Sequence, residues 1–168
     1  LSQGPSSHSC VISTDGDLYC WGNNDRGQVG NGQICFDWDG SIVTYVNPCD
    51  DSASGIRTPE LIAMPGGVSV TSVSVGGEHT CATGTDGGMY CWGSDMNCRV
   101  TGGDIVDPDP ITEAPGCGYW WITSSPRKLE MSNTEITIQD VANLSFVQAA
   151  NGWVFSCAMT GSGEGVCW

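Results

Sequence analysis

A short cysteine motif occurs three times along this chain, and it constrains the fold more than any other feature. The copies read HSCVISTDGDLYCWG, HTCATGTDGGMYCWG and FSCAMTGSGEGVCW, and in each copy the second cysteine follows the first by ten positions. The pairs are Cys10 and Cys20, Cys81 and Cys91, and Cys157 and Cys167. Such a repeat predicts an architecture in which each unit buries its apolar surface against its neighbours.

Each copy is typical of a tight antiparallel hairpin. If Cys10 lies opposite Cys20, Ile12 faces Leu18, and residues 14–16 form a three-residue loop. The last position of such a loop needs a positive φ, and all three copies have glycine there. Apolar residues flank the cysteines on both faces, which predicts a hairpin covered on both sides by other sheets.

Cysteines that lie opposite one another on neighbouring strands can reach disulfide geometry, so we expect one disulfide in each hairpin. Zinc is the rival interpretation. It is disfavoured because zinc sites use close cysteine pairs or several histidines, and this chain has no such close pair and only two histidines. The other four cysteines lie in two long inserts, and our preferred pairing is Cys35 with Cys49 and Cys98 with Cys117, among many connectivities that the sequence leaves open.

Composition narrows the class of protein further. Five basic and 19 acidic residues give a net charge of −14, which disfavours nucleic acid as a partner. No apolar run approaches the roughly 20 residues of a membrane-spanning helix, so we expect no membrane insertion in this segment. Ten cysteines indicate an oxidising compartment. The length suits one repeat domain over 1–168, divided into approximate repeats 1–56, 57–124 and 125–168.

The motif extends on both sides of the cysteines. Thr58-Pro59 precedes a stretch of alternating valines and then Gly76-Gly77-Glu78-His79. Gly27-Gln28-Val29-Gly30 follows the first hairpin, and we expect residues 21–30 to form a loop and a short outer strand. This pattern resembles the regulator-of-chromosome-condensation repeat, most clearly over 8–30 and 57–93. The third copy departs from it, with Phe155 where the others have histidine. The paired cysteines resemble the secreted members of the family, such as the ectodomains of crinkly-type receptor kinases.

The resemblance implies that each repeat forms a four-stranded antiparallel blade of a β-propeller. We therefore expect an all-β fold of three propeller-type repeats that form a partial or open propeller. Each repeat has a disulfide in its hairpin, and this prediction allows the blades at the two ends to be incomplete. Three blades are too few to close a ring. We expect the missing strands to come from a longer chain or from neighbouring copies that pair through the unclosed edges. We also expect the tryptophan after each second cysteine to pack against its own disulfide and the next blade.

No sequence motif indicates catalysis or a bound cofactor, so we expect a protein that is not an enzyme. The resemblance gives His8 and His79 a structural contact at a strand end. Two short carboxylate pairs, Asp37 with Asp39 and Asp107 with Asp109, fit turns better than a cation site, and we expect no metal.

Two features outside the repeat are candidate sites. Tyr119, Trp120 and Trp121 end an insert, where they could present a rigid aromatic anchor to a partner, although an outer strand would explain them equally well. Asn143 begins the only N-x-S/T sequence, so it is the candidate position for an N-linked glycan.

These observations predict a secreted or cell-surface binding and assembly module that contributes to a larger surface or fibrous structure. The alternatives are a receptor ectodomain fragment and a secreted propeller that binds or inhibits another protein. Guanine-nucleotide exchange on chromatin, the role of the nuclear member of the family, is disfavoured by the acidic charge and the cysteine pattern.

Overall fold

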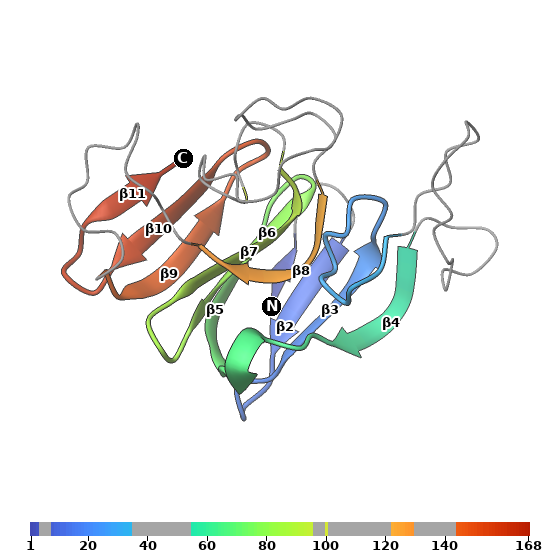
Figure 1. The fold of residues 1–168 in the computed structure, drawn as a ribbon, viewed down its shortest axis with the longest axis horizontal. Coiled ribbons are helices and arrows are strands. Elements are labelled where there is room, and N and C mark those ends of the chain that lie inside the picture. The colour runs from blue at the N-terminus through green and yellow to red at the C-terminus, as the bar shows by residue number, and fades with distance from the viewer. Residues whose placement is uncertain (4–7, 35–54, 96–99, 101–121, 130–143) are drawn as a thin grey trace.

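The computed structural model describes residues 1–3, 8–34, 55–95, 100, 122–129 and 144–168, and the described residues form β-strands with a single short helical turn. The strands make three antiparallel sheets that follow one another along the chain (Figure 1). The first sheet contains β1 (Ser2–Gln3), β2 (His8–Ile12), β3 (Leu18–Asn23) and β4 (Gly55–Leu61). The second contains β5 (Val70–Val75), β6 (His79–Gly84), β7 (Met89–Ser94) and β8 (Ile122–Lys128). The third contains β9 (Phe146–Asn151), β10 (Ser156–Thr160) and β11 (Gly165–Cys167).

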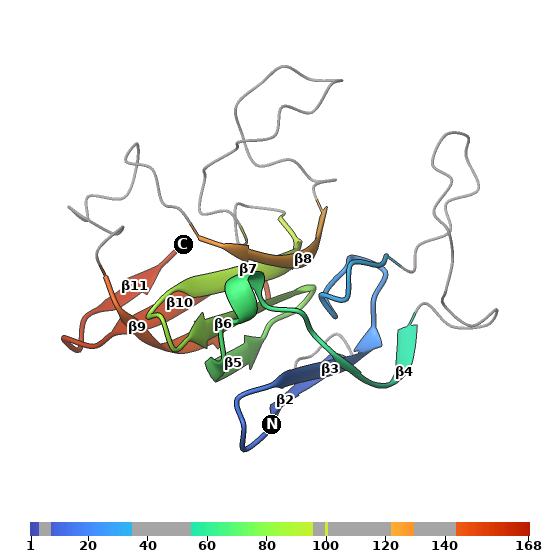
Figure 2. The ribbon, with the colours of Figure 1, turned by 60° about the horizontal axis from the view of Figure 1, so that its bottom comes forward.

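The three sheets stack side by side as blades, with the second between the first and the third (Figure 2). Strand β2 contacts β5, and both β5 and β6 contact β9. The helical turn η1 (Pro65–Gly67) lies on the connection from the first sheet to the second. The predicted all-β partial propeller is confirmed.

Each of the first two sheets takes its outermost strand from the segment that opens the next sequence repeat. In the first sheet β4 pairs with β3, with Leu61 opposite Tyr19, and in the second β8 pairs with β7, with Lys128 opposite Tyr90. Our expectation of a short outer strand within 21–30 is therefore wrong. Those residues finish β3 and then form turns, because the buried amide of Asn24 hydrogen-bonds the backbone of Val29 and Gln33.

The hairpins have the predicted register. Cys10 lies opposite Cys20 and Ile12 opposite Leu18, and the backbone N–H of Ser13 donates to the carbonyl of Asp17 over 2.8 Å. The loop glycines Gly16, Gly87 and Gly163 have φ of +86°, +73° and +88°, respectively. A side chain is strained at these values, so glycine at the loop end lets the hairpin close after three residues.

The apolar core lies between the sheets. One cluster fills the space between the first and second sheets and contains the sulfur atoms of Cys10 and Cys20 together with Trp92. A second cluster lies between the second and third sheets and contains Cys81 and Cys91. Every residue of β6 and β7 is buried, as predicted for a hairpin covered on both sides. Each of these two cysteine pairs thus faces the sheet that follows it.

Candidate functional site

The predicted site residues fall into two groups. The structure joins the hairpin cysteines by disulfides, Cys10 to Cys20, Cys81 to Cys91 and Cys157 to Cys167. The remaining predictions lie outside the described residues: the insert cysteines Cys35, Cys49, Cys98 and Cys117, the aromatic residues Tyr119, Trp120 and Trp121, the carboxylates Asp37, Asp39, Asp107 and Asp109, and Asn143.

A hydrogen bond from a histidine to a hydroxyl-bearing residue joins each pair of neighbouring sheets. His8 Nε2 lies 2.8 Å from Thr80 Oγ1, and His79 Nε2 lies 3.0 Å from Ser156 Oγ. All four residues are buried. Both histidines begin the second strand of their sheet, and both bonds run to the following sheet. The histidines therefore have the structural contact that the resemblance implied.

The direction of the first of these bonds can be assigned. The hydroxyl of Thr80 donates to the carbonyl of Gln28 over 2.8 Å, so its oxygen accepts the proton on Nε2 of His8. Burial lowers the pKa of His8 from 6.5 to about 4, which keeps the imidazole neutral. A neutral ring fits an apolar junction, since an unpaired charge there would be costly to bury.

A second hydrogen bond repeats between the innermost strands. The backbone N–H of Val75 donates to Ser2 Oγ over 3.1 Å, and the backbone N–H of Asn151 donates to Ser74 Oγ over 2.8 Å. The two serines are equivalent positions, because Ser2 lies opposite Cys10 and Ser74 lies opposite Cys81. Each junction between sheets is therefore held by a histidine bond and a serine bond.

Trp92 completes the first junction. Its indole N–H donates to the carbonyl of Gln28 over 3.0 Å, and the side chain is fully buried. Trp92 packs in the cluster shared with the first sheet, so our expectation that this tryptophan faces the next blade is wrong. Gly30 lies against the indole ring, and a Cβ atom at that position would overlap it.

Asp86 forms a separate polar cluster at the turn of the second hairpin. Its carboxylate accepts hydrogen bonds from Lys128 Nζ over 2.8 Å and from the hydroxyl of Tyr90 over 2.9 Å. The Lys128 ammonium lowers the pKa of Asp86, whereas burial and the Asp86 carboxylate raise the pKa of Tyr90. These bonds tie the turn of the second hairpin to β8.

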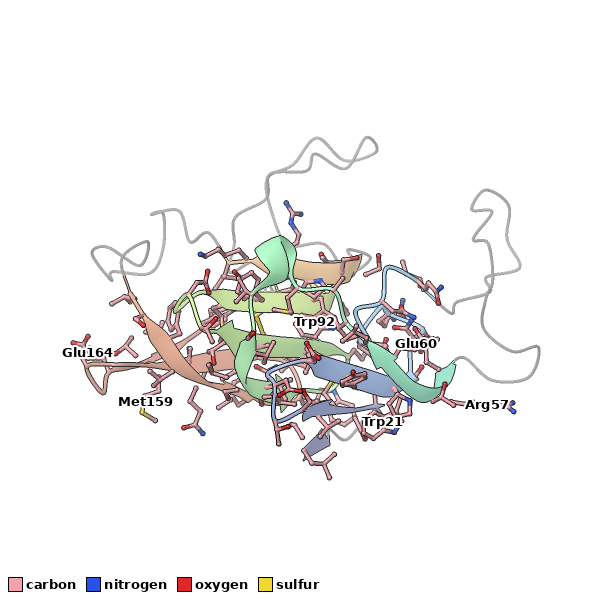
Figure 3. All side chains as sticks on the ribbon, turned by 90° about the horizontal axis from the view of Figure 1, so that it is seen from below. Trp21, Arg57, Glu60, Trp92, Met159 and Glu164 are labelled. Atoms are coloured by element: carbon pink, nitrogen blue, oxygen red, sulfur yellow. A yellow bond between two sulfur atoms is a disulfide. The ribbon has the colours of Figure 1, made fainter. Side chains whose placement is uncertain are left out.

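The third sheet presents an apolar surface on the side away from the second sheet. We define the third-sheet outer face by Val147, Ala150, Phe155 and Met159, the Cys157–Cys167 disulfide and one exposed polar side chain, Gln148, which lies opposite Met159. Phe155 and Val147 are each 50% exposed and Met159 is 43% exposed, whereas the cysteines of the first two hairpins are fully buried. Figure 3 shows Met159 pointing away from the other two sheets, while Trp92 lies within the stack.

The third-sheet outer face lacks both of the bonds that join the other sheets. Phe155 occupies the histidine position: its ring covers Gly152 as the ring of His79 covers Gly76. Ala150 lies opposite Cys157 as Ser74 lies opposite Cys81, so the serine position has no hydroxyl. The sequence pattern identified Phe155 as a departure from the repeat. That Ala150 replaces the serine can be recognised only once the register of β9 against β10 is known.

Two classes of site find no support among the described residues. No group of three or more histidine, cysteine, aspartate or glutamate side chains in this part of the chain is arranged to hold a metal ion. None of the helical segments found within these residues is long and apolar enough to cross a membrane.

Comparison with protein families gives two matches, both to the Regulator of chromosome condensation (RCC1) repeat, over residues 15–83 and 70–98. The Ultraviolet-B receptor UVR8 of Arabidopsis thaliana is 25% identical over 96% of this chain and 39% of the relative. Protein pim1 of Schizosaccharomyces pombe is 32% identical over 60% of this chain and 17% of the relative. The chain therefore spans well under half the length of these relatives.

Solved structures agree on the fold. Prp20p from Saccharomyces cerevisiae superposes with a TM-score of 0.62 at 23% identity, covering 96% of this chain and 31% of that chain. Human WBSCR16 superposes with a TM-score of 0.58 at 20% identity, covering 100% of this chain and 31% of that chain. At these identities the similarity establishes a shared architecture and nothing finer.

Proposed function

Because this chain belongs to the regulator of chromosome condensation repeat family, we propose that it is a non-enzymatic protein-interaction module that works outside the cell as one part of a larger structural assembly. The observation that carries this proposal is the third-sheet outer face. It is the only face of a described hairpin disulfide that is open to solvent, since the following sheet buries the other two pairs. An exposed apolar surface of this kind is typical of a site that another protein, or a further part of a longer chain, covers in the assembly.

The extracellular part of the proposal rests on the disulfides. Each of the three hairpins carries one, and disulfides persist in oxidising compartments. Cys10, Cys20, Cys81 and Cys91 are fully buried between sheets, where reduction would leave thiols in the middle of the core. A stack built around such pairs suits a protein that matures outside the cytosol.

The kind of partner follows from charge and from the relatives. A net charge of −14 disfavours DNA and leaves protein as the partner. The structural study of Prp20p names Gsp1p and histones as its binding partners, and a second yeast structure shows the same protein bound to Kap60. These precedents support protein binding as the general role of the stack. We do not transfer their individual partners, because the chain covers less than a third of Prp20p.

A receptor ectodomain or a secreted inhibitor is the second candidate function. The same outer face supports it, because Phe155 and Met159 could contact the surface of a target protein as well as another part of an assembly. The aromatic segment Tyr119, Trp120 and Trp121 would be a further anchor in this case. Substitution Trp120→Ala should then weaken binding of the target, and unchanged binding would count against the aromatic anchor.

The proposal is tested on native material. We expect the protein to sediment as a large assembly after export through an oxidising secretory route, and electron microscopy should show particles or filaments that contain it. Peptide mapping without reductant should recover the three hairpin disulfides from that material. Recovery of the native protein as a reduced, cytosolic monomer would contradict the proposal.

A further inference from the structure

The sequence has two Asn-Gly pairs, and the structure places both of them at junctions between sheets. They are Asn31 before Gly32 and Asn151 before Gly152. We infer that both asparagines are deamidation sites that the closed junctions protect, and that reaction at either site prevents its junction from closing again. The inference concerns the stack itself, so it goes beyond the proposed function and does not depend on it.

An asparagine that precedes glycine can react with its own backbone. The backbone nitrogen of the glycine loses its proton and attacks the side-chain carbonyl carbon of the asparagine. A new C–N bond forms, the bond to the side-chain nitrogen breaks, and ammonia leaves. Water then opens the cyclic succinimide at either carbonyl and gives aspartate or isoaspartate, so water is the only co-reactant. Glycine favours this attack because it has no Cβ atom to hinder the approach.

At Asn151 the junction between the second and third sheets holds the reacting groups in place. The side-chain amide donates to the carbonyl of Ser74 over 2.9 Å, and the backbone N–H of Asn151 donates to Ser74 Oγ over 2.8 Å. The attacking nitrogen belongs to Gly152, and its N–H donates to the carbonyl of Phe155 over 2.9 Å. This bond must break before the nitrogen can lose its proton and turn towards the side chain.

The bond that protects Gly152 is a feature of the repeat. In the second sheet the backbone N–H of Gly76 donates to the carbonyl of His79 over 2.8 Å, as Gly152 donates to Phe155. The third sheet covers that turn, because a Cβ atom on Gly76 would meet the carbonyl oxygen of Gly152. The geometry at Gly152 therefore has a counterpart inside the stack.

At Asn31 other elements have the same effect. Its side-chain amide donates to Glu60 Oε2 on β4 over 2.7 Å and to Gln33 Oε1 over 2.9 Å. Glu60 is labelled on this strand in Figure 3. The backbone N–H of Gly32 donates to the carbonyl of Ser124 on β8 over 2.8 Å, which joins the first repeat to the second sheet. Both asparagines are therefore held away from the reactive geometry while the sheets stay together.

The product of deamidation fits neither site. A carboxylate in place of the Asn151 amide would face the carbonyl oxygen of Ser74 without a proton to donate, at a partly buried position. At Asn31 the new carboxylate would face that of Glu60, and like charges at this separation repel one another. Isoaspartate at Asn151 would also lengthen the main chain at the end of β9. Deamidation should therefore act in one direction and leave the junction open.

The first test follows deamidation of the full chain, with its disulfides intact, at mildly alkaline pH. Peptide mass spectrometry separates asparagine, aspartate and isoaspartate at each site, in the folded protein and in urea. We expect both sites to react more slowly in the folded protein, by roughly tenfold or more, because reaction needs an opened junction. Asn24, which precedes Asp25, is the internal reference and should react slowly in both states. Equal rates at Asn151 in the two states would overturn the inference.

Two variants distinguish the opening of one junction from unfolding of the whole chain. Ser74→Ala removes the hydroxyl that accepts the N–H of Asn151, and it should speed deamidation there by about threefold or more while Asn31 is unchanged. Glu60→Ala removes an acceptor of the Asn31 amide and should have the reverse effect. Each variant is thus the matched control for the other. Acceleration of both sites by either variant would contradict local protection, because the whole chain would then have to unfold.

The one-way step is tested with the product itself. The backbone N–H of Ala149 bonds to Ser72 Oγ across the same junction over 3.4 Å. Asn151→Asp should speed hydrogen exchange at this N–H by roughly tenfold or more. Ala63→Asp adds the same charge at an exposed position before η1 and should leave the exchange unchanged. Unchanged exchange in Asn151→Asp would show that the junction closes over the carboxylate, which overturns the one-way step.

Discussion

His8 and Thr80 stand 72 positions apart in the sequence, and their side chains meet at 2.8 Å across the boundary between the first two sheets. The contact is made of one hydrogen bond in which neutral imidazole donates and the hydroxyl accepts, because the same hydroxyl donates onward to Gln28. His79 and Ser156 repeat it at the next boundary. The stack is therefore held by a polar bond inside each apolar junction, as well as by the apolar clusters around it.

The first prediction concerns Thr80. Thr80→Val keeps the shape of the side chain but removes the acceptor for the buried Nε2–H of His8. It also removes one of the two donors to the Gln28 carbonyl, which keeps its bond from Trp92. We expect the free energy of unfolding to fall by about 1–3 kcal/mol. Urea denaturation followed by circular dichroism measures it. Thr58→Val on the exposed side of β4 is the control, and an equal loss there would contradict the role of the junction.

The second prediction is a dependence of stability on pH. The pKa of His8 is about 4 in the folded chain and 6.5 as its ordinary value, so folding favours the neutral ring. The contribution of His8 to the free energy of unfolding is fully present above pH 6.5. It is lost as the pH falls from 6.5 towards 4 and changes no further below pH 4. The full effect is about 3 kcal/mol.

Carboxylates also titrate in this range, so the His8 contribution is measured as a difference. His8→Gln keeps an N–H donor but does not titrate, and its unfolding free energy should depend less on pH between 6.5 and 4 than that of the unsubstituted chain. Titration of the His8 ring by NMR gives the pKa directly. A ring that titrates near 6.5 in the folded protein would refute the prediction.

The hairpins were predictable from sequence because everything that determines them is local. The cysteine spacing, the alternation around Ile12 and Leu18, and the glycine at the loop end lie within 15 residues. The family resemblance then supplied the blade, including the structural role of the histidines. Those inferences needed no knowledge of how one sheet meets another.

The direction in which each sheet faces its neighbours could not be predicted in the same way. Both faces of β6 and β7 are buried, so the apolar pattern does not distinguish them. Trp92 was therefore expected against the following sheet, whereas it lies against the preceding one. The third-sheet outer face depends likewise on Ala150, an unremarkable residue until the strand register places it opposite Cys157.

The third prediction is an order of reduction among the disulfides. Cys167 is exposed and Cys157 half-buried, whereas Cys10, Cys20, Cys81 and Cys91 have no exposed surface. Thiol–disulfide exchange needs access to a sulfur atom, so a mild thiol reductant should open Cys157–Cys167 before the other two pairs. Alkylation of the free thiols at graded reductant concentrations, followed by peptide mass spectrometry, gives the order. Simultaneous opening of all three would mean that reduction follows unfolding of the whole stack.

The fourth prediction isolates the contact between Gly30 and Trp92. Gly30 and Gly163 have nearly the same φ, +87° and +88°, but a Cβ at Gly30 would overlap the buried indole, whereas nothing lies within 4 Å of one at Gly163. Gly163→Ala should therefore cost about 1–2 kcal/mol of stability from backbone strain alone. Gly30→Ala bears the same strain and must also displace Trp92, which adds about 1–3 kcal/mol of overpacking. Chemical denaturation gives both values, and the tryptophan fluorescence of the folded chain should change only in Gly30→Ala. Equal losses of stability in the two variants would contradict a steric contact between a side chain at position 30 and the Trp92 indole.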